Sequence, residues 1–389
     1  MEKKKSKVTY LIPVCFLFTL LGIGILNIGS VLPVTDTDFL QNGGSQMEED
    51  YRTNFWQQRR WVDLYGIVQN VMGKRLSGNM RFIRTDSGWM DYVTKESEVE
   101  PFAEEMTELK QRLDEREIPL LYIQMPVREP EDSSEPAVLM RTRTYYDQIR
   151  EVTDAAGILC MDEEEILEGE GAPTREEFYF KTDVHTTTKG EIWMANKIAR
   201  KLEQEYQIRI PGLISENDER FEKHTHPFAG NLVQSLGQYY VGTDVFEEYI
   251  PKEQPLYHIE DVFGNWYADG NFEEVIMNGY DQNYEDEMYT YWVTNYLRYG
   301  SGGYHVENLD ADGPSLLVIC DSLCYRTLAY LSLECQNITV IDPRFIPADG
   351  TDYVEKALDD KEYDAAIYLH GTFYTTDHSM FGRWSLQEE

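Results

Sequence analysis

The sequence is poor in basic residues and in cysteine, and each shortage excludes a class of protein. Its 389 residues include 35 Lys and Arg against 70 Asp and Glu, so the formal net charge is −35. A surface this acidic repels phosphate backbones, and we expect no nucleic acid as a partner. The five cysteines form no C-x-x-C pair, and a chain of this length needs no disulfide scaffold. With 42% hydrophobic residues and 13% aromatic residues, it can instead build a large core.

Charged residues are missing from one long stretch near the N-terminus. Residues 1–7 carry four lysines, and the 25 residues that follow, 8–32, carry no charge. A helix of that length spans a hydrocarbon core of roughly 30 Å, and lysines before a span favour a cytoplasmic N-terminus. A cleaved signal peptide has a similar layout, but the run is long and no A-x-A-like site follows it. We therefore expect a single-pass protein of the cell membrane, with a cytoplasmic tail (1–7), an anchor (8–32), a stalk (33–54) and an extracytoplasmic domain (55–389).

Short apolar runs alternate with amphipathic stretches through most of that domain. The runs predict strands at 118–125, 157–162, 315–320, 337–342 and 364–369. The amphipathic stretches predict helices at 100–117, 144–156, 187–206 and 354–360, and another from about Ser322. This alternation indicates an α/β fold, with a mainly parallel sheet of five strands and helices on both of its faces.

Two other regions do not follow this rhythm. Residues 54–74 have apolar side chains at helical spacing, and residues 80–92 alternate around an Asp-Ser-Gly turn, so we expect an amphipathic helix and then a hairpin. Residues 207–313 are rich in Tyr, Gly, Asn and acidic residues. We interpret this segment as an insertion or cap built on the sheet.

Three residues with the chemistry of a serine-nucleophile site stand in two separate places. In sheets of this kind, functional sites form beyond the carboxyl ends of the strands, and Ser322 follows the predicted strand 315–320. Asp183 and His185 lie in FYFKTDVHTTTKG, just before the predicted helix 187–206. An imidazole activates a hydroxyl from about 2.6–3.2 Å when a third group orients it. The alternative is that Ser322 is an ordinary helix cap, that Asp183 or Thr186 caps the helix beginning near Thr187, and that His185 is incidental.

The same residues also allow a metal site. Asp183 and His185 could join His224 and His226 as oxygen and nitrogen ligands. However, the segment around His224 is polar and charged, which is typical of a loop, and no recognised zinc spacing is present. We therefore expect no metal and no cofactor.

Four segments stand out together, namely FYFKTDVHTTTKG, LLVICDSLC, ITVIDPRF and YDAAIYLHG, and to them are added an S-G-W turn at 87–89 and HPFAGNLVQSLG. In this combination the chain resembles the DHHW-motif membrane-anchored proteins of Gram-positive bacteria. The family is related to the AlgJ/AlgX-type alginate O-acetyltransferases within the SGNH-hydrolase-like class. The resemblance implies a three-layer α/β/α domain of that class.

Carried over residue by residue, the resemblance implies a Ser-His-Asp triad. Asp183 would orient the base, His185 would be the base and Ser322 the nucleophile. Their order along the chain also matches the family, because the D-x-H motif comes before the serine. The second and fourth letters of D-H-H-W are Val184 and Thr186 here, so this chain has no aromatic ring at the fourth position to stack on a sugar.

Further site residues follow from the same resemblance. Arg344 matches a recurrent arginine and is a candidate for substrate or oxyanion contact, and Arg128 looks like a second basic position of the family. For the oxyanion asparagine, Asn231 and Asn295 are both candidates.

The implied activity is the transfer of an acyl group, first of all acetyl, to a hydroxyl of a cell-surface or secreted polysaccharide, or to water. The implied partners are the glycan acceptor and a membrane acyltransferase that exports the acyl group. The alternative is a non-catalytic glycan-binding or assembly protein of a surface-polymer export system.

Overall fold

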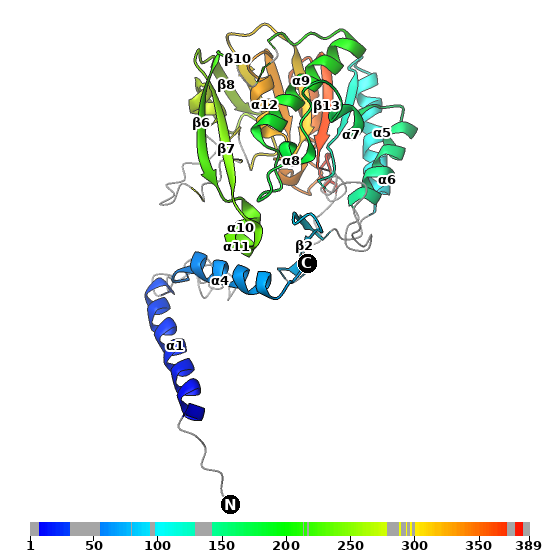
Figure 1. The fold of residues 1–389 in the computed structure, drawn as a ribbon. Coiled ribbons are helices and arrows are strands. Elements are labelled where there is room, and N and C mark those ends of the chain that lie inside the picture. The colour runs from blue at the N-terminus through cyan, green and yellow to red at the C-terminus, as the bar shows by residue number, and fades with distance from the viewer. Residues whose placement is uncertain are drawn as a thin grey trace, which may run out of the picture.

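The domain is built around one central sheet with helices packed against both faces (Figure 1). The computed structural model describes residues 8–31, 55–78, 80–93, 98–128, 142–212, 214–215, 218–277, 288, 293, 296–297, 300–371 and 378–383. The predicted tail at 1–7 and the predicted stalk at 33–54 lie outside these residues.

The central sheet has eight strands. Their order is β5 (Leu159–Met161), β4 (Leu120–Gln124), β13 (Ala365–His370), β11 (Ser315–Cys320), β12 (Asn337–Ile341), β10 (Gly303–Asn308), β8 (Leu256–Asp261) and β9 (Tyr267–Asn271). The first five are parallel and correspond to the five predicted strands. The last three pair antiparallel, so the prediction of a five-stranded sheet is wrong, and the sheet is mixed.

The three extra strands come from residues 207–313, the segment interpreted as an insertion or cap. Buried parallel strands show as continuous apolar runs, whereas an antiparallel edge with one wet face carries polar residues as well. Strand β8 alternates buried and more exposed positions, and β9 has no buried residue. Their sequences, LYHIED and YADGN, therefore lack the signal by which the other five strands were recognised.

Helices cover the two faces of the sheet, and alternate side chains of each strand point to opposite sides. On β4, Leu121 and Ile123 join one hydrophobic cluster and Leu120 and Tyr122 join the other. The first cluster contains residues of α9 (Thr188–Tyr206) and α12 (Tyr325–Leu331). The second contains residues of α5 (Glu100–Asp114), α6 (Thr142–Ala155) and α13 (Tyr353–Asp360).

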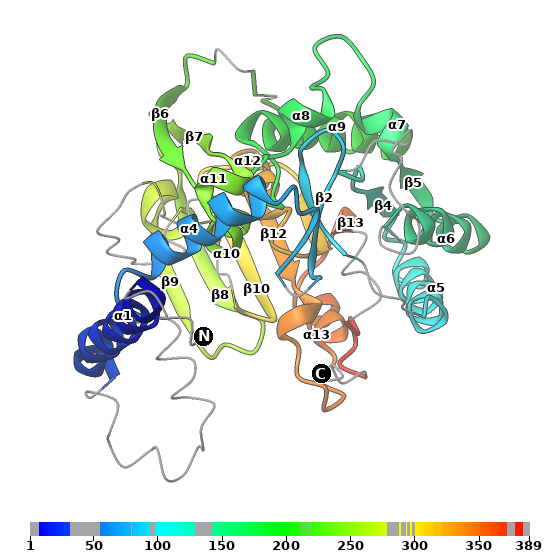
Figure 2. The ribbon, with the colours of Figure 1, turned by 60° about the horizontal axis from the view of Figure 1, so that its bottom comes forward.

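Smaller elements surround this core (Figure 2). The predicted hairpin is confirmed as β2 (Phe82–Arg84) and β3 (Met90–Tyr92), which β1 (Leu76–Ser77) extends. A two-stranded ribbon, β6 (Phe221–Phe228) and β7 (Asp244–Pro251), stands apart from the central sheet. The short helical elements are α7 (Glu163–Ile166), α8 (Arg175–Phe178), α10 (Asn231–Leu236), α11 (Gln238–Val241), the π-helix η2 (Phe272–Ile276) and the 3-10 helix η5 (Pro343–Phe345).

Among the described residues, two helices precede the hairpin. Helix α4 (Gln58–Val71) packs against α10 and α11, and α1 (Val8–Val31) forms where the anchor was predicted. Within the part of the chain that the structure describes, no helix combines the length and the apolar character needed to cross a membrane, and the anchor at 8–32 stays a prediction. Near the end of α1, Asn27 donates a hydrogen bond to the Ile23 carbonyl and accepts one from the Trp56 N–H.

Candidate active site

Asp183 and His185 lie in the loop between α8 and α9, which backbone hydrogen bonds close. The N–H of Thr187 donates to the carbonyl of Phe178, and the N–H of Phe180 donates to the carbonyl of His185. These bonds bring the two ends of the loop together in front of α9. The D-x-H segment is therefore held in one conformation before any side chain contributes.

Asp183 is fully buried and uses both carboxylate oxygens. Its Oδ1 accepts the backbone N–H of His185 at 3.0 Å and lies 2.5 Å from Nδ1 of that imidazole. Its Oδ2 accepts the backbone N–H of Asn231 at 2.7 Å. Burial opposes the charged form of Asp183, but the imidazole and these hydrogen bonds outweigh it and lower the pKa of the carboxyl group. The side chain is therefore a carboxylate that orients the imidazole.

Ser322 lies in a turn at the carboxyl end of β11, and 9% of its surface is exposed. Asp321 sets that turn, because its Oδ1 accepts the N–H of Leu323 at 2.9 Å and its Oδ2 accepts the N–H of Gly371 at 2.9 Å. Helix α12 consequently begins at Tyr325, and the expectation of a helix from about Ser322 is wrong by about one turn. Ser322 thus precedes the helix and does not cap it.

The two halves of the site meet through side chains. Nε2 of His185 lies 3.2 Å from Oγ of Ser322, within the distance at which an imidazole can accept a hydroxyl proton. Asp183, His185 and Ser322 thus form one continuous chain of hydrogen bonds. Nη1 of Arg344 donates to the same Oγ at 3.1 Å.

Arg344 comes from the end of β12, the strand beside β11. Asp342 holds its guanidinium in two places, accepting from Nε at 2.9 Å and from Nη2 at 2.6 Å. The hydroxyl of Tyr325 donates to the same Asp342 carboxylate at 2.6 Å. Burial disfavours the charge of Arg344, but Asp342 more than compensates and raises the pKa of the guanidinium. A fixed positive charge therefore stands beside Oγ of Ser322, where it can stabilise negative charge that develops there.

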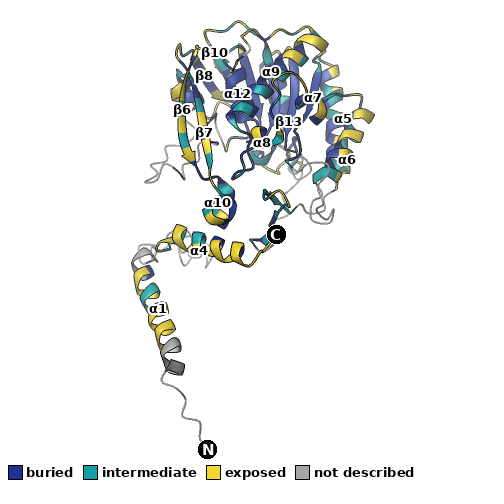
Figure 3. Cartoon of the chain, viewed as in Figure 1, coloured by how far each residue is buried: buried dark blue, intermediate teal, exposed yellow. Residues whose placement is uncertain are grey.

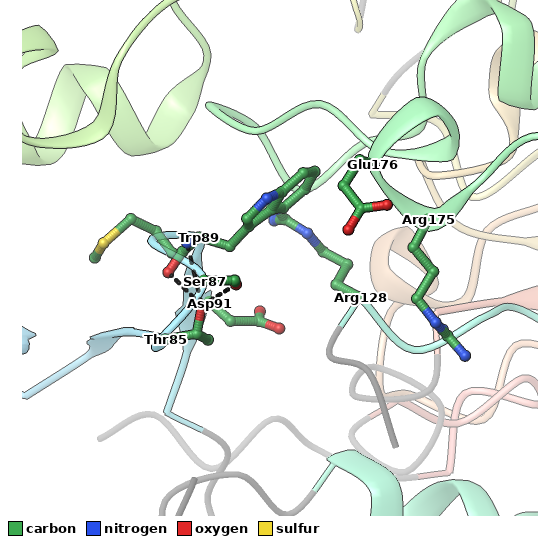
Figure 4. A pocket seen from close by; sticks show the side chains of 8 residues that line it. Thr85, Ser87, Trp89, Asp91, Arg128, Arg175 and Glu176 are labelled. Carbon is green, nitrogen blue, oxygen red and sulfur yellow. Dashed lines mark hydrogen bonds between the residues drawn. The ribbon is translucent and has the colours of Figure 1, made fainter. Parts of the chain in front are cut away.

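Arg128 supports the loop and does not reach Ser322 by any hydrogen bond within the described residues. Its Nη2 donates to the carbonyl of Phe180 at 2.9 Å, and its guanidinium carbon lies 5.5 Å from the centre of the Trp89 ring. Nε and Nη1 are buried and find no hydrogen-bond partner in the described part of the chain. Figure 4 shows Arg128 beside Trp89 and Asp91 in the lining of a pocket between the hairpin and helix α8.

The predicted asparagines and the second pair of histidines lie elsewhere. Asn231 contributes its backbone N–H to Asp183, whereas Asn295 lies outside the described residues. His224 and His226 are on strand β6, which corrects the expectation of a loop, and Nε2 of each lies 3.4 Å from a glutamate oxygen. Among the residues that the structure describes, no three His, Cys, Asp or Glu side chains are grouped to hold a metal ion.

A buried ion pair, which the sequence did not reveal, connects the helices behind the two halves of the site. Arg326 of α12 and Glu191 of α9 are each about 2% exposed, with Nη2 and Oε1 3.3 Å apart. Nη2 also donates to the carbonyl of Thr186, next to His185, and the Thr327 hydroxyl donates to Glu191. The feature of the sequence that could have indicated this ion pair is the single arginine in helix α12, YRTLAYL, whose other residues are all uncharged.

The backbone around Asp183 is also packed without spare room. A methyl group on Gly230 would lie 2.4 Å from the Thr182 carbonyl oxygen and 2.5 Å from Cβ of Asp183, so only glycine fits there. The N–H and hydroxyl of Thr182 both donate to Oδ2 of Asp244 at 2.7 Å. The β6–β7 ribbon and the loop after β6 therefore hold the D-x-H segment in place.

Comparison with known proteins gives one family match and several similar structures. Residues 86–264 match the SGNH hydrolase-like domain of the acetyltransferase AlgX. PatB1 of Bacillus cereus is 16% identical with a TM-score of 0.56, over 77% of this chain and 98% of PatB1. A DHHW family protein of Eubacterium siraeum is 15% identical with a TM-score of 0.54, over 78% of this chain and 93% of that protein. No curated protein matches the chain. At these identities, the structural likeness shows the fold.

Proposed function

We propose that this chain, whose residues 86–264 match the SGNH hydrolase-like domain of the acetyltransferase AlgX, is a serine-dependent O-acyltransferase or esterase. The observation that carries the proposal is geometric. Oγ of Ser322 lies 3.2 Å from Nε2 of His185, and the other nitrogen of that imidazole faces the buried carboxylate of Asp183. This is the arrangement that activates a serine hydroxyl.

The first half of the reaction forms an acyl-enzyme. His185 accepts the hydroxyl proton as Oγ of Ser322 bonds to the carbonyl carbon of an acyl ester. Arg344 and the Ser322 N–H stabilise the negative charge of the tetrahedral intermediate. When the intermediate collapses, the ester bond of the donor breaks, and His185 returns the proton to the departing alcohol oxygen.

The second half passes the acyl group on. His185 takes a proton from an acceptor hydroxyl, whose oxygen attacks the acyl carbon, and Ser322 leaves with that proton. We propose a glycan as the acceptor outside the cytoplasm, with a membrane acyltransferase supplying the acyl group. Two findings support this chemistry: the domain that residues 86–264 match is that of an acetyltransferase, and PatB1 of Bacillus cereus has been solved with a sulfonyl adduct.

The direct test measures acetyl-ester turnover and labelling by a sulfonyl fluoride. Ser322→Ala should lower turnover by at least roughly 10³-fold and abolish the label, because it removes the attacking oxygen. Ser215→Ala, at an exposed serine, is the matched control and should keep both. Unchanged turnover in a folded Ser322→Ala chain would contradict the mechanism. A wild-type chain that neither turns over esters nor takes the label, yet binds glycan, would identify a binding protein.

A further inference from the structure

Helix α4 turns its apolar side chains away from the protein. The residues buried in it are Gly66 and Gln69, whereas large apolar residues face outward with exposed fractions from 37% for Trp61 to 84% for Val71. The outward set is Trp61, Leu64, Tyr65, Ile67, Val68, Val71 and, just after the helix, Met72. A surface helix of a globular protein normally shows the reverse pattern. In Figure 3 much of α4 is coloured as exposed.

The inner side of α4 fixes this orientation. A methyl group on Gly66 would lie 2.7 Å from the carbonyl oxygen of Leu236, so the helix backbone touches α10 directly. The carboxylate of Asp63 accepts the backbone N–H of Gln238 at 2.9 Å and its side-chain amide at 3.2 Å. Turning the apolar face inward would break these contacts and bury Asp63. The outward apolar face is therefore a stable feature of the fold.

Positive charge is concentrated around the same helix. Residues 55–84 contain six basic side chains, Arg59, Arg60, Lys74, Arg75, Arg81 and Arg84, and one acidic side chain, Asp63. The segment thus has a net charge of +5 within a chain of −35, and all of these basic residues except Arg84 are exposed. In an isologous dimer through this face, two segments of net charge +5 would repel each other, whereas an anionic surface would be attracted to the segment.

The apolar surface continues onto the neighbouring helix α1. There, Phe16, Leu17 and Phe18 are 58–72% exposed, and the bond between Asn27 and the Trp56 N–H connects the two helices. In Figure 1, α1 leads away from the end of α4 on the side opposite the central sheet. The two helices therefore present neighbouring apolar surfaces below the domain.

We propose that the outward face of α4 lies in the interface of an anionic phospholipid bilayer, with the exposed basic residues Arg60 and Lys74 contacting lipid headgroups. Aromatic and aliphatic side chains on one face, bordered by arginine and lysine, are the composition of an interfacial helix. Because α4 packs on α10, whose first N–H binds Asp183, this contact holds the candidate active site at a fixed height above the lipid. The inference does not depend on the proposed chemistry.

The test places an environment-sensitive fluorophore on α4 of the full chain in vesicles. A Cys15→Ser, Leu64→Cys chain is labelled and compared with a matched chain labelled at Glu115→Cys, an exposed position at the end of α5. In vesicles of phosphatidylcholine and phosphatidylglycerol at 3:1, brominated lipids should quench the Leu64→Cys label at least about twofold more than the control label. Arg60→Glu with Lys74→Glu should reduce that quenching, as should high salt.

Two results would overturn the proposal. The first is equal quenching at Leu64→Cys and Glu115→Cys, and the second is formation of disulfide-linked dimers by unlabelled Leu64→Cys chains at low protein density. The second result would assign the face to another copy of the chain. Val71→Cys, the most exposed position of α4, provides an independent label if Leu64→Cys fails to fold.

Discussion

The two halves of the candidate site are held in different ways. Ser322 and Arg344 follow β11 and β12, neighbouring parallel strands in the middle of the sheet, so the strand ladder fixes their spacing. Asp183 and His185 lie on a loop outside the sheet, and individual hydrogen bonds to Asn231 and to its own backbone hold that loop. The serine half is therefore positioned by the strand ladder, whereas the histidine half is positioned by a small number of hydrogen bonds within and around one loop.

The largest expected effect on ester turnover comes from substituting His185 and Ser322, the residues through which the two halves meet. If His185 and Ser322 act as one unit, His185→Gln and Ser322→Ala should each lower ester turnover by roughly 10⁴-fold, and the double variant should be no slower than either. The measurement is a double-mutant cycle on the turnover rate. If the double variant instead loses the product of the two single-variant losses in turnover, the halves contribute independently, contrary to the geometry.

Removing the charge from the histidine half should have the next largest effect. Asp183→Asn should lower turnover by roughly 10³- to 10⁴-fold, because the amide no longer fixes the orientation and charge of the His185 imidazole. Circular dichroism of the variant checks that the fold persists. Retained turnover at neutral pH would show that the imidazole is oriented by another group.

The same substitution has a defined pH dependence in stability. The folded-state pKa of Asp183 is lowered, so its stabilising contribution is complete above the unfolded value of about 3.9 and is lost as the pH falls through the folded value. The difference in unfolding free energy between the wild type and Asp183→Asn should therefore be constant near neutral pH and shrink in acid. Denaturant titrations at a series of pH values test this, and a difference that grows in acid would contradict it.

The link between the halves should affect stability more than chemistry. Glu191→Ala leaves the buried guanidinium of Arg326 without its carboxylate, and breaking such a pair costs about 3–5 kcal/mol of unfolding free energy. Glu203→Ala, at an exposed position of the same helix, is the matched control and should change little. Similar midpoints of urea unfolding for both variants would show that the pair does not connect α9 and α12.

The smallest expected effect lies in the packing behind Asp183. Gly230→Ala inserts a methyl group where the Thr182 carbonyl oxygen is 2.4 Å away, and overpacking of this kind costs about 1–3 kcal/mol. Because Asp183 must move, turnover should fall along with stability. A stability loss with unchanged turnover would show that the carboxylate tolerates displacement.

This difference between the halves also explains what the sequence could predict. The parallel strands of the serine half are continuous apolar runs, and Ser322 could be placed at the end of one of them. The order of Asp183, His185 and Ser322 was recognisable because these residue types stand beside strand and helix ends. Whether the loop would meet the strand could not be read from periodicity, because it depends on contacts across the whole domain.

The supports of the histidine half left no comparable signal. The contribution of Asn231 is its backbone N–H, which every residue except proline carries. Glu191 and Arg326 each look like solvated charges on amphipathic helices until the tertiary structure buries them together. The antiparallel strands β8 to β10 were missed for the related reason that their polar residues resemble those of a loop.

The contact between His185 and Ser322 spans 137 positions of the chain. Contacts of such long range form late, because the entropy of closing the intervening segment must be overcome first. A partly synthesised or partly folded chain therefore holds a serine without its base. We expect acyl chemistry to begin only when the whole domain has folded, which makes the onset of activity a direct measure of complete folding.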